Sequence, residues 1–310
     1  MKVLITGGAG FIGSNLAEFF LERGAETHVI DNLRSGFEKN LDRLNGVVFH
    51  KGSITDFELV EKAIEGSDYV FNLAALVSVP ESLEKPEECV DINVKGLLNV
   101  LKAAKNQGVK KVVHASSAAV YGDDPALPKV PEMTPQPKTP YAITKLDGEY
   151  YLKMFYEEFG LNTASLRFFN VYGPKQDPKS QYAAAVPIFI FKALKNEDIT
   201  IYGDGEQTRD FVFVKDVAKA LALAAETEKP KSVYNVANGS SITIKTLAGK
   251  IIELTNSQSK IIFAPERSGD IKHSLASIEK TVKELNFRPE VSLDEGLAQT
   301  IEYFKKRMVE

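Results

Sequence analysis

The chain has 310 residues, of which 44% are hydrophobic, so its length and composition suit about two domains with packed cores. Its 38 Lys and Arg residues are outnumbered by 42 Asp and Glu residues, and the net charge of −4 argues against a nucleic-acid-binding protein. Residue 1 leads straight into a strand-like run, and no stretch approaches the ~20 apolar residues of a membrane span. We therefore expect a soluble, cytoplasmic protein without a membrane partner.

The cysteine and histidine content argues against a metal centre. Cys89 is the single cysteine, which excludes an internal disulfide and a cysteine-built metal site and fits a reducing compartment. The four histidines, His28, His50, His114 and His273, show no metal-ligand spacing. We expect no bound metal.

The first half of the chain alternates β-branched runs with helical patterns. Strands are expected at 2–6, 27–31, 47–50, 69–74, 110–116 and 163–169, and helices at 11–23, 57–65, 86–107 and 140–159. Strands that alternate with helices predict a parallel sheet covered by helices on both faces, which is a doubly wound α/β fold.

The pattern changes after Asn170, where the elements become shorter and are broken at 172–180 and 202–207 by Gly, Pro and Asp. We expect a first domain over residues 1–170, to which about 209–237 return, and a smaller α/β domain over 171–310.

A glycine-rich turn follows the first expected strand. The sequence GGAGFIG places Gly7, Gly10 and Gly13 at three-residue spacing before an amphipathic helix, where backbone N–H groups and the helix dipole attract a pyrophosphate. The second strand ends at Asp31, whose carboxylate can accept both ribose hydroxyls of an adenosine and repels a 2′-phosphate. This arrangement predicts NAD. Arg34 is the one feature that would favour NADP, and its alternative interpretation is a solvated loop charge.

The reactive groups are expected in two segments. PYAITK places Tyr141 four residues before Lys145, so on a helix the phenol and the ammonium share one face, and an adjacent cation favours phenolate. About one such spacing is expected by chance in this composition. The order of the segments raises its significance, because the dinucleotide turn precedes Ser116 and Ser117 at a strand tip, and Tyr141 follows 24 residues after Ser117.

These segments, together with DNLRSG, NLAAL, INVKG, SSAAVYG, RFFNVYGP, GDGEQTRDFVFVKDVA and RSGDIKHS, carry a resemblance that spans nearly the whole chain. The chain resembles the extended short-chain dehydrogenase/reductase family, and within it the nucleotide-sugar 4-epimerases, above all those acting on UDP-N-acetylglucosamine (UDP-GlcNAc). The resemblance implies a Rossmann fold with a second, smaller substrate domain, NAD as cofactor, and a UDP-sugar as substrate.

The resemblance also implies roles for individual residues. Tyr141 would take the proton from the sugar 4-hydroxyl, Lys145 would assist it and hold the nicotinamide ribose, and Ser117 would bridge Tyr141 and the 4-hydroxyl. The implied cofactor-binding residues are Gly7, Gly10, Phe11, Ile12, Gly13, Asp31, Asn32, Leu33, Ser35, Gly36, Ser53, Ile54, Leu73, Ala74, Ala75, Asn93, Tyr141, Lys145 and Phe169. The implied substrate-binding residues are Ser78, Ser117, Asn170, Ala185, Val186, Thr200, Tyr202, Arg209, Arg267, Asp270 and Ser274.

One residue departs from the family pattern. After the third strand these enzymes usually carry an aspartate that contacts the adenine amine, and this chain has Ser53 there. A hydroxyl can still accept a hydrogen bond but brings no charge, so the departure bears on adenine affinity and not on catalysis.

The two positions after Ser117 bear on the reaction. Relatives that eliminate water from a 4-keto sugar carry an Asp-Glu pair there, and decarboxylases typically carry a glutamate, whereas this chain has Ala118 and Ala119, which transfer no proton. This favours 4-epimerisation. A UDP-glucuronate decarboxylase or one-way dehydrogenase of the same fold is the alternative, and a non-enzymatic NAD-binding regulator is disfavoured because Ser117, Tyr141 and Lys145 are all present.

Two further expectations follow from the resemblance. A small Ser274 on the C2 side of the hexose leaves room for a 2-acetamido group, with Ser78 as a second contact, so UDP-GlcNAc and UDP-N-acetylgalactosamine (UDP-GalNAc) are expected substrates, with UDP-glucose and UDP-galactose also accepted. A homodimer is expected through helices at about 93–107 and 141–159, whose apolar residues include Leu97, Val100, Leu101, Leu146, Tyr150 and Met154.

Overall fold

The computed structural model describes residues 1–178, 184–229, 231–266 and 272–309. It is built around one parallel sheet of seven strands in the order β11-β6-β5-β4-β1-β2-β3. These strands are β1 (Lys2–Thr6), β2 (Glu26–Asp31), β3 (Val47–Lys51), β4 (Tyr69–Asn72), β5 (Lys111–Ser117), β6 (Thr163–Phe168) and β11 (Lys231–Val236). The predicted doubly wound fold is confirmed. Strand order reverses beside β1, which is where such sheets place a ligand crevice.

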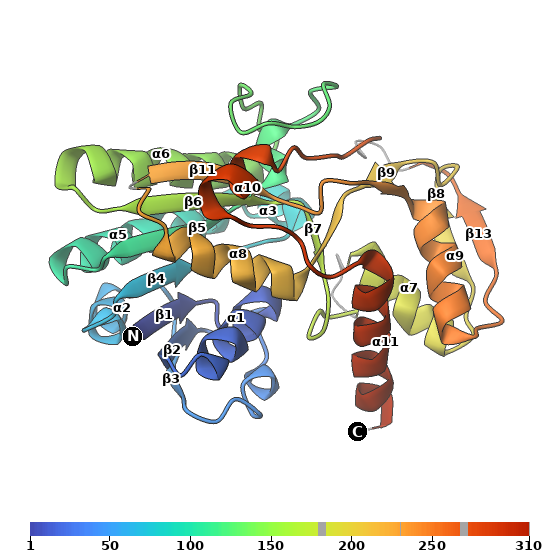
Figure 1. Ribbon diagram of the computed structural model, residues 1–310, viewed down its shortest axis with the longest axis horizontal. Helices are drawn as coiled ribbons and strands as arrows, with labels where there is room; N and C mark the ends of the chain where they lie inside the picture. The colour runs from blue at the N-terminus through green and yellow to red at the C-terminus, as the bar shows by residue number, and fades with distance from the viewer. Residues whose placement is uncertain (179–183, 230, 267–271, 310) are drawn as a thin grey trace.

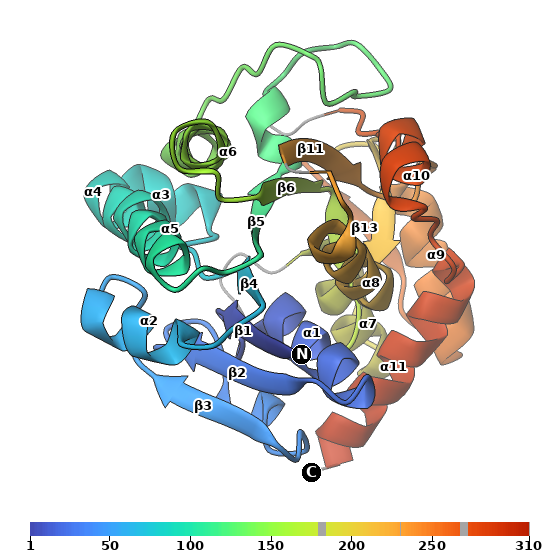
Figure 2. The same cartoon turned by 60° about the vertical axis from the view of Figure 1, so that its left-hand side comes forward.

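Helices cover both faces of this sheet (Figure 2). Helices α1 (Phe11–Glu22) and α8 (Val214–Glu226) lie on one face, where Leu16, Phe20 and Leu221 join the core. Helices α2 (Phe57–Ile64), α5 (Gly96–Asn106) and α6 (Pro140–Phe159) cover the other face with Val60, Leu97 and Leu152. The burial of both faces explains why the strands are apolar runs without alternation.

Helix α6 begins and ends where the sequence predicted. Thr139 accepts a hydrogen bond from the Ala142 N–H at 3.3 Å, Pro140 fits the first helical position, and Gly160 ends the helix with φ +70°. These local signals fix the first turn of the helix, which carries Tyr141.

The helix expected over 86–107 differs from the prediction at its centre. It comprises α4 (Pro86–Val90), a π turn (Asp91–Lys95) and α5, and it is preceded by the short helix α3 (Val79–Glu84). The π turn faces Asn93 inward, where its side chain bonds the loop after β4. A tertiary contact of this kind leaves no mark in helical periodicity.

The smaller elements of the second half of the chain lie at the other end of the molecule (Figure 1). They comprise α7 (Ala185–Leu194), α9 (Ile244–Thr255), α11 (Leu293–Val309) and the parallel pair of β8 (Ile199–Tyr202) with β13 (Ile261–Ala264). Two smaller pairs join β7 (Asn170–Tyr172) with β10 (Phe211–Phe213), and β9 (Thr208–Arg209) with β12 (Ile242–Thr243). Helix α10 (Glu279–Leu285) packs against β11, and short 3-10 turns occur at Glu38–Asn40 and Ala118–Tyr121.

The chain crosses between the two ends more than once. After β10 it returns to the large sheet as α8 and β11, and β11 pairs with β6 from Lys231↔Thr163 to Val236↔Phe168. Within the described residues, no helix has the length and apolar character needed to span a membrane. The division into two domains at residue 170 stays a prediction.

Candidate functional site

The turn after β1 is compact enough to require its glycines. Gly7 has φ +69° and donates its N–H to the Ile30 carbonyl at 2.7 Å, which ties the turn to the end of β2. A Cβ on Gly13 would collide with the Gly7 carbonyl and approach the Gly8 Cα to 2.8 Å. Helix α1 therefore starts directly against the turn. Its first backbone N–H groups, from Phe11 and Ile12 onward, lie beside the turn, and the N-terminus of a helix is a common binding site for anions.

Asp31 lies at the end of β2 against the same turn. Its carboxylate accepts backbone N–H groups, Oδ2 from Ala9 at 3.0 Å and Oδ1 from Leu33 at 2.8 Å. Burial raises the pKa of Asp31, and the backbone N–H groups of Leu33, Ala9 and Gly10 oppose the rise. Because a carboxylate has about four acceptor positions, Asp31 can also accept ribose hydroxyls. A Cβ on Gly36 would lie 2.9 Å from Oδ2, so this position also needs glycine. Asn32 and Ser35 are exposed beside it.

Arg34 is engaged by acidic side chains. Its Nη2 donates to Glu81 Oε1 at 2.8 Å and to Glu88 Oε2 at 3.0 Å. The guanidinium is therefore neutralised by α3 and α4 and is not a free ligand for a 2′-phosphate. This arrangement adds to the case for NAD over NADP.

The residues after β3 form a local turn. Ser53 Oγ accepts hydrogen bonds from the Thr55 N–H at 3.2 Å and the Thr55 hydroxyl at 2.9 Å. Ile54 is buried against Gly96, where a Cβ would approach the Ile54 side chain to 2.6 Å. Ser53 thus has part of its hydrogen-bonding capacity used within its own turn.

The loop after β4 lies against the glycine turn. The Ala74 N–H donates to Thr6 Oγ1 at 3.2 Å, and a Cβ on Gly7 would come within 2.8 Å of the Ala74 nitrogen. Asn93 connects this loop to α6. Its Oδ1 accepts a hydrogen bond from the Leu76 N–H at 2.7 Å, and its Nδ2 donates to Thr144 Oγ1 on α6 at 2.9 Å. Leu73, Ala74 and Ala75 are half-buried at the crevice, whereas Asn93 is buried beneath them.

Ser117, Tyr141 and Lys145 come together at the tip of β5. The Ser117 hydroxyl contacts the Tyr141 side chain and accepts a hydrogen bond from the Ala119 N–H at 3.1 Å. Lys145 Nζ donates to the Ala115 carbonyl at 2.8 Å and lies 5.8 Å from the centre of the Tyr141 ring. The backbone N–H of Tyr141 donates to Ser82 Oγ at 3.2 Å, an anchor from α3 that the sequence did not reveal.

The ionisation of this group differs from the expectation drawn from spacing. Burial raises the pKa of Tyr141, and the Ser117 hydroxyl only partly opposes the rise. Burial also lowers the pKa of Lys145 to about 8. The Lys145 ammonium group donates to a backbone carbonyl. Its closeness to Tyr141 therefore does not by itself favour the phenolate form of Tyr141.

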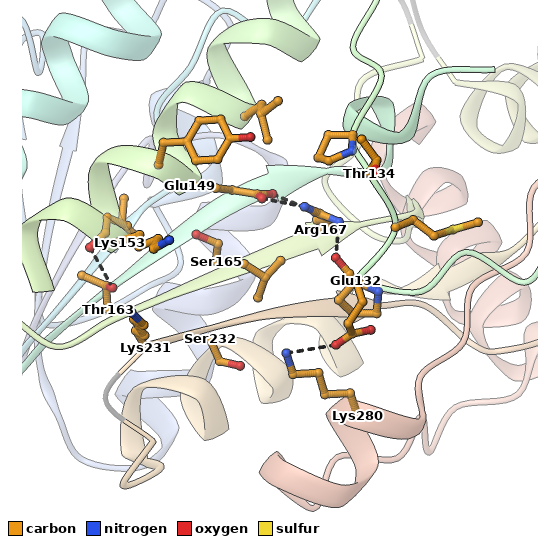
Figure 3. Close-up of a pocket in the computed structure, with 17 residues that line it drawn as sticks. Glu132, Thr134, Glu149, Lys153, Thr163, Ser165, Arg167, Lys231, Ser232 and Lys280 are labelled. Atoms are coloured by element: carbon orange, nitrogen blue, oxygen red, sulfur yellow. Dashed lines mark hydrogen bonds and ion pairs between the residues drawn. The ribbon is translucent and has the colours of Figure 1, made fainter. Parts of the chain in front are cut away.

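The two adjacent serines face opposite sides of β5, as neighbouring strand residues must. Ser116 Oγ donates to Glu149 Oε1 at 2.5 Å, and Glu149 forms a two-bond ion pair with Arg167 at 2.8 and 2.7 Å (Figure 3). Sequence reasoning missed Glu149 and Arg167. The one available signal was the alternation of side chains along a strand. It places Ser116 on the face of the sheet opposite to Ser117, where a buried hydroxyl needs a polar partner.

Several predicted sugar-side residues lie on segments that the structure joins. The Ser274 N–H donates to the Thr208 carbonyl at 3.1 Å, and Arg209 Nη1 donates to that same carbonyl at 2.9 Å. Asn170 Nδ2 donates to the Asp210 carbonyl at 3.2 Å. Strand β9 and its flank therefore bring Asn170, Arg209 and Ser274 into one neighbourhood.

The remaining predicted substrate residues, and the predicted cofactor residue Phe169, are more scattered. Tyr202 ends β8 and is 38% exposed, Thr200 is half-buried on the same strand, and Phe169 is buried beside Tyr121. Ala185 begins α7, and the Val186 side chain is packed in the local core. Ser78 begins α3, where its Oγ accepts from the Glu81 N–H at 3.1 Å. Arg267 and Asp270 lie outside the described residues.

Comparison with known proteins identifies the family to which the chain belongs. Residues 3–237 match the profile of the NAD dependent epimerase/dehydratase family. The chain belongs to this family.

Similar members cover almost all of the chain. A UDP-glucose 4-epimerase of Mycolicibacterium smegmatis is 36% identical over 99% of both chains. A UDP-N-acetyl-alpha-D-glucosaminuronate decarboxylase of Bacillus cytotoxicus is 35% identical over 98% of both chains. The solved UDP-N-acetylglucosamine 4-epimerase of Methanobrevibacter ruminantium, in complex with UDP-N-acetylmuramic acid, is 42% identical over 99% of both chains with a TM-score of 0.95.

This epimerase/dehydratase chain uses NAD, as its family does. The residues fit the cofactor: the glycine turn lacks the Cβ atoms that would fill it, and Asp31 keeps acceptor capacity for ribose hydroxyls. The predicted family and cofactor are confirmed.

Proposed function

We propose that the protein is a UDP-hexose 4-epimerase. The observation that carries the proposal is the environment of Ser117: it contacts Tyr141 on one side, and on the other it bonds the backbone of a turn that begins with Ala118 and Ala119. The site thus has a hydroxyl pair for moving the sugar 4-hydroxyl proton and offers no acid or base at those two positions.

The residues have distinct parts in the reaction. Tyr141 takes the proton from the sugar 4-hydroxyl, and Ser117 bridges the two oxygens so that the proton moves along a short hydrogen-bonded path. NAD, when bound, would supply the hydride acceptor for C4 and the hydride for its return. Because the pKa of Tyr141 is raised by burial, the positive nicotinamide ring is the natural cation to offset that rise. Lys145 is placed to hold the nicotinamide ribose.

Inversion follows from what the site lacks. A 4-keto hexose beside a protein carboxylic acid can lose water, and a 4-keto uronate can lose its C6 carboxylate as carbon dioxide, but alanine at 118 and 119 transfers no proton. The remaining course is hydride return, and return to the opposite face of the 4-keto sugar inverts C4.

The likeness to the Bacillus cytotoxicus decarboxylase supports a second candidate, a UDP-uronate decarboxylase. The two are separated by products, because a decarboxylase releases carbon dioxide and an epimerase yields only the C4 epimer. Net accumulation of NADH would instead indicate a one-way dehydrogenase.

For the substrate we propose UDP-GlcNAc and UDP-GalNAc, with UDP-glucose and UDP-galactose also accepted. The serine at 274 supports this: its backbone is fixed by the Thr208 carbonyl, and its small side chain leaves room beside the sugar C2. Ser78 would contact the acetamide. Asn170, Arg209, Arg267 and Asp270 would hold the UDP group, with Tyr202 packing near uracil. The similar solved structure from Methanobrevibacter ruminantium is named as a UDP-GlcNAc 4-epimerase, which supports N-acetylated substrates for this chain.

The decisive experiment combines product analysis with one substitution. Incubation with each UDP-sugar and separation of the C4 epimers should show interconversion. Tyr141→Phe should lower turnover by about a thousandfold or more, because it removes the group that takes the proton, while UDP-sugar affinity stays near that of the wild type. Turnover near the wild-type value in this variant would refute the mechanism.

We also propose a homodimer, with a revised interface. Leu97, Val100 and Leu101 are fully buried in the core and cannot contact a partner. The exposed apolar side chains lie instead on neighbouring helices: Leu83 on α3, Val90 on α4, and Ile143 and Tyr150 on α6. Light scattering at micromolar concentration should give about twice the 34.2 kDa chain mass, and a monomer mass would count against the dimer.

A further inference from the structure

A second pocket lies away from the cofactor crevice, between α6, β6, β11 and the segment 131–135 (Figure 3). Its volume is about 510 Å³, which is within the range of small-molecule sites. None of the residues predicted to bind NAD or sugar lines it. The pocket is therefore separate from the predicted NAD and sugar residues, and Tyr150 in its lining also belongs to the proposed dimer interface.

The walls of this pocket are cationic although the chain as a whole is acidic. Lys153, Lys231, Lys280 and Arg167 line it against only two carboxylates, Glu132 and Glu149. Glu149 is committed to Arg167, and Lys280 Nζ lies 3.4 Å from Glu132. Lys231 pairs with Glu157, which lies outside the pocket lining. Three of the four lining cations are thus paired with a carboxylate, and Lys153 is the one without such a partner among the described residues.

Lys153 is the least committed of these cations. It extends from the exposed face of α6 and forms no hydrogen bond or close ion pair with any residue that the structure describes. Its charge also acts on Glu157, whose main partner is Lys231. An ammonium group at the pocket edge is therefore available to an anion.

A buried hydroxyl faces the same space. Ser165 on β6 is only 2% exposed, lines the pocket, and has no hydrogen-bond partner among the described residues. Its neighbours in the lining are engaged: Thr163 Oγ1 donates to the Leu152 carbonyl at 3.2 Å, and Ser232 Oγ lies 3.4 Å from Glu284. A donor that is otherwise unpaired at the floor of a pocket gains a hydrogen bond when a ligand oxygen reaches it.

We propose that this pocket binds a small organic phosphate, a phosphate monoester carried on a sugar-sized group. A phosphate can accept hydrogen bonds from both an ammonium group, here Lys153, and a hydroxyl, here Ser165. The apolar part of the lining, including Pro131, Met133 and Leu146, suits the organic portion. This proposal is independent of the reaction catalysed at Tyr141.

Binding can be tested by calorimetry on the NAD-loaded protein with excess UDP present, so that nucleotide sites are occupied. Glucose 6-phosphate is the probe, glucose is the uncharged control, and inorganic phosphate tests the anion alone. We expect saturable binding of one glucose 6-phosphate per chain, with no binding of glucose. Equally tight binding of inorganic phosphate would overturn the assignment of an ester.

Variants locate the site. Lys153→Glu should weaken binding at least about tenfold, because it replaces an attractive charge by a repulsive one, and Ser165→Ala should weaken it about threefold. The matched control is Lys305→Glu, an exposed lysine on α11, which should leave affinity unchanged. Lys153 is exposed, so its variant should fold, and thermal unfolding checks this. Equal affinity of Lys153→Glu and Lys305→Glu, or no saturable binding to the wild type, would overturn the proposal.

Discussion

The cofactor end of the crevice and its proposed sugar end are held in different ways. At the cofactor end, Gly7, Gly13 and Asp31 are fixed by backbone contacts within one β–α–β unit. At the sugar end, Thr208 meets His273 and Ser274 through contacts between segments 65 residues apart. The close backbone contacts at Gly7 and Gly13 leave no space for a larger side chain. At the other end, Ser274 is held through its backbone N–H, so its side chain can change without loss of that contact. We therefore expect substitutions to abolish binding at the cofactor end and to alter selectivity at the sugar end.

The largest effect on ligand binding is expected from Gly13→Ala. The added Cβ would collide with the Gly7 carbonyl, so NAD affinity should fall at least about a hundredfold, measured by calorimetry. The matched control is Gly249→Ala in α9 at the sugar end, where a Cβ would meet nothing within 4 Å. That variant should keep NAD affinity and gain about 0.5–1 kcal/mol of stability from the helix preference of alanine. Unchanged NAD affinity in Gly13→Ala would remove the contrast between the two ends.

A smaller and selective effect is expected from Ser274→Tyr. An aromatic ring would occupy the space that the acetamido group needs, so kcat/KM for UDP-GlcNAc should fall more than about tenfold while that for UDP-glucose changes less than about threefold. Ser274→Ala serves as the control and should spare both sugars. An equal loss on both sugars in the tyrosine variant would show that residue 274 does not select between them.

The smallest effect concerns the pH dependence of NAD binding. Burial lowers the pKa of Lys145 to about 8, so the ammonium is charged below that pH and neutral above it. A neutral amine is a weaker donor to a ribose hydroxyl, and NAD affinity should fall severalfold between pH 7 and pH 9. Fluorescence titration measures this, and Lys145→Met should bind NAD more weakly with a flat profile over the same range. A wild-type profile as flat as that of the variant would refute the assignment.

The sequence predicted best what local spacing determines. The strand–turn–helix pattern, the start of α6 at Pro140 and the end of β2 at Asp31 are short-range features, and the structure has all of them. The approach of Tyr141 and Lys145 to Ser117 was predicted from helical spacing and from the resemblance. These features need no knowledge of how distant segments pack.

What the sequence did not predict depends on long-range packing. The partner of Ser116 is an ion pair contributed by α6 and β6, and the π turn at Asn93 forms because its side chain bonds a loop seventeen residues earlier. The direction of the Tyr141 pKa shift is set by burial, which spacing does not report. The Arg34 partners lie 47 and 54 residues away.

The return of α8 and β11 to the large sheet has a consequence for how this chain can diversify. Lys111 at the start of β5 donates its ammonium protons to the carbonyls of Ala224, Thr227 and Lys229, which ties the end of α8 to the centre of the sheet. A single break near residue 170 would leave the edge of β6 unpaired and one face of α1 uncovered. Exchange of the sugar-side elements by recombination therefore needs at least two junctions, one before β8 and one on the return path. Selectivity is more readily changed by point substitutions at positions such as Ser274 than by transplanting a terminal module.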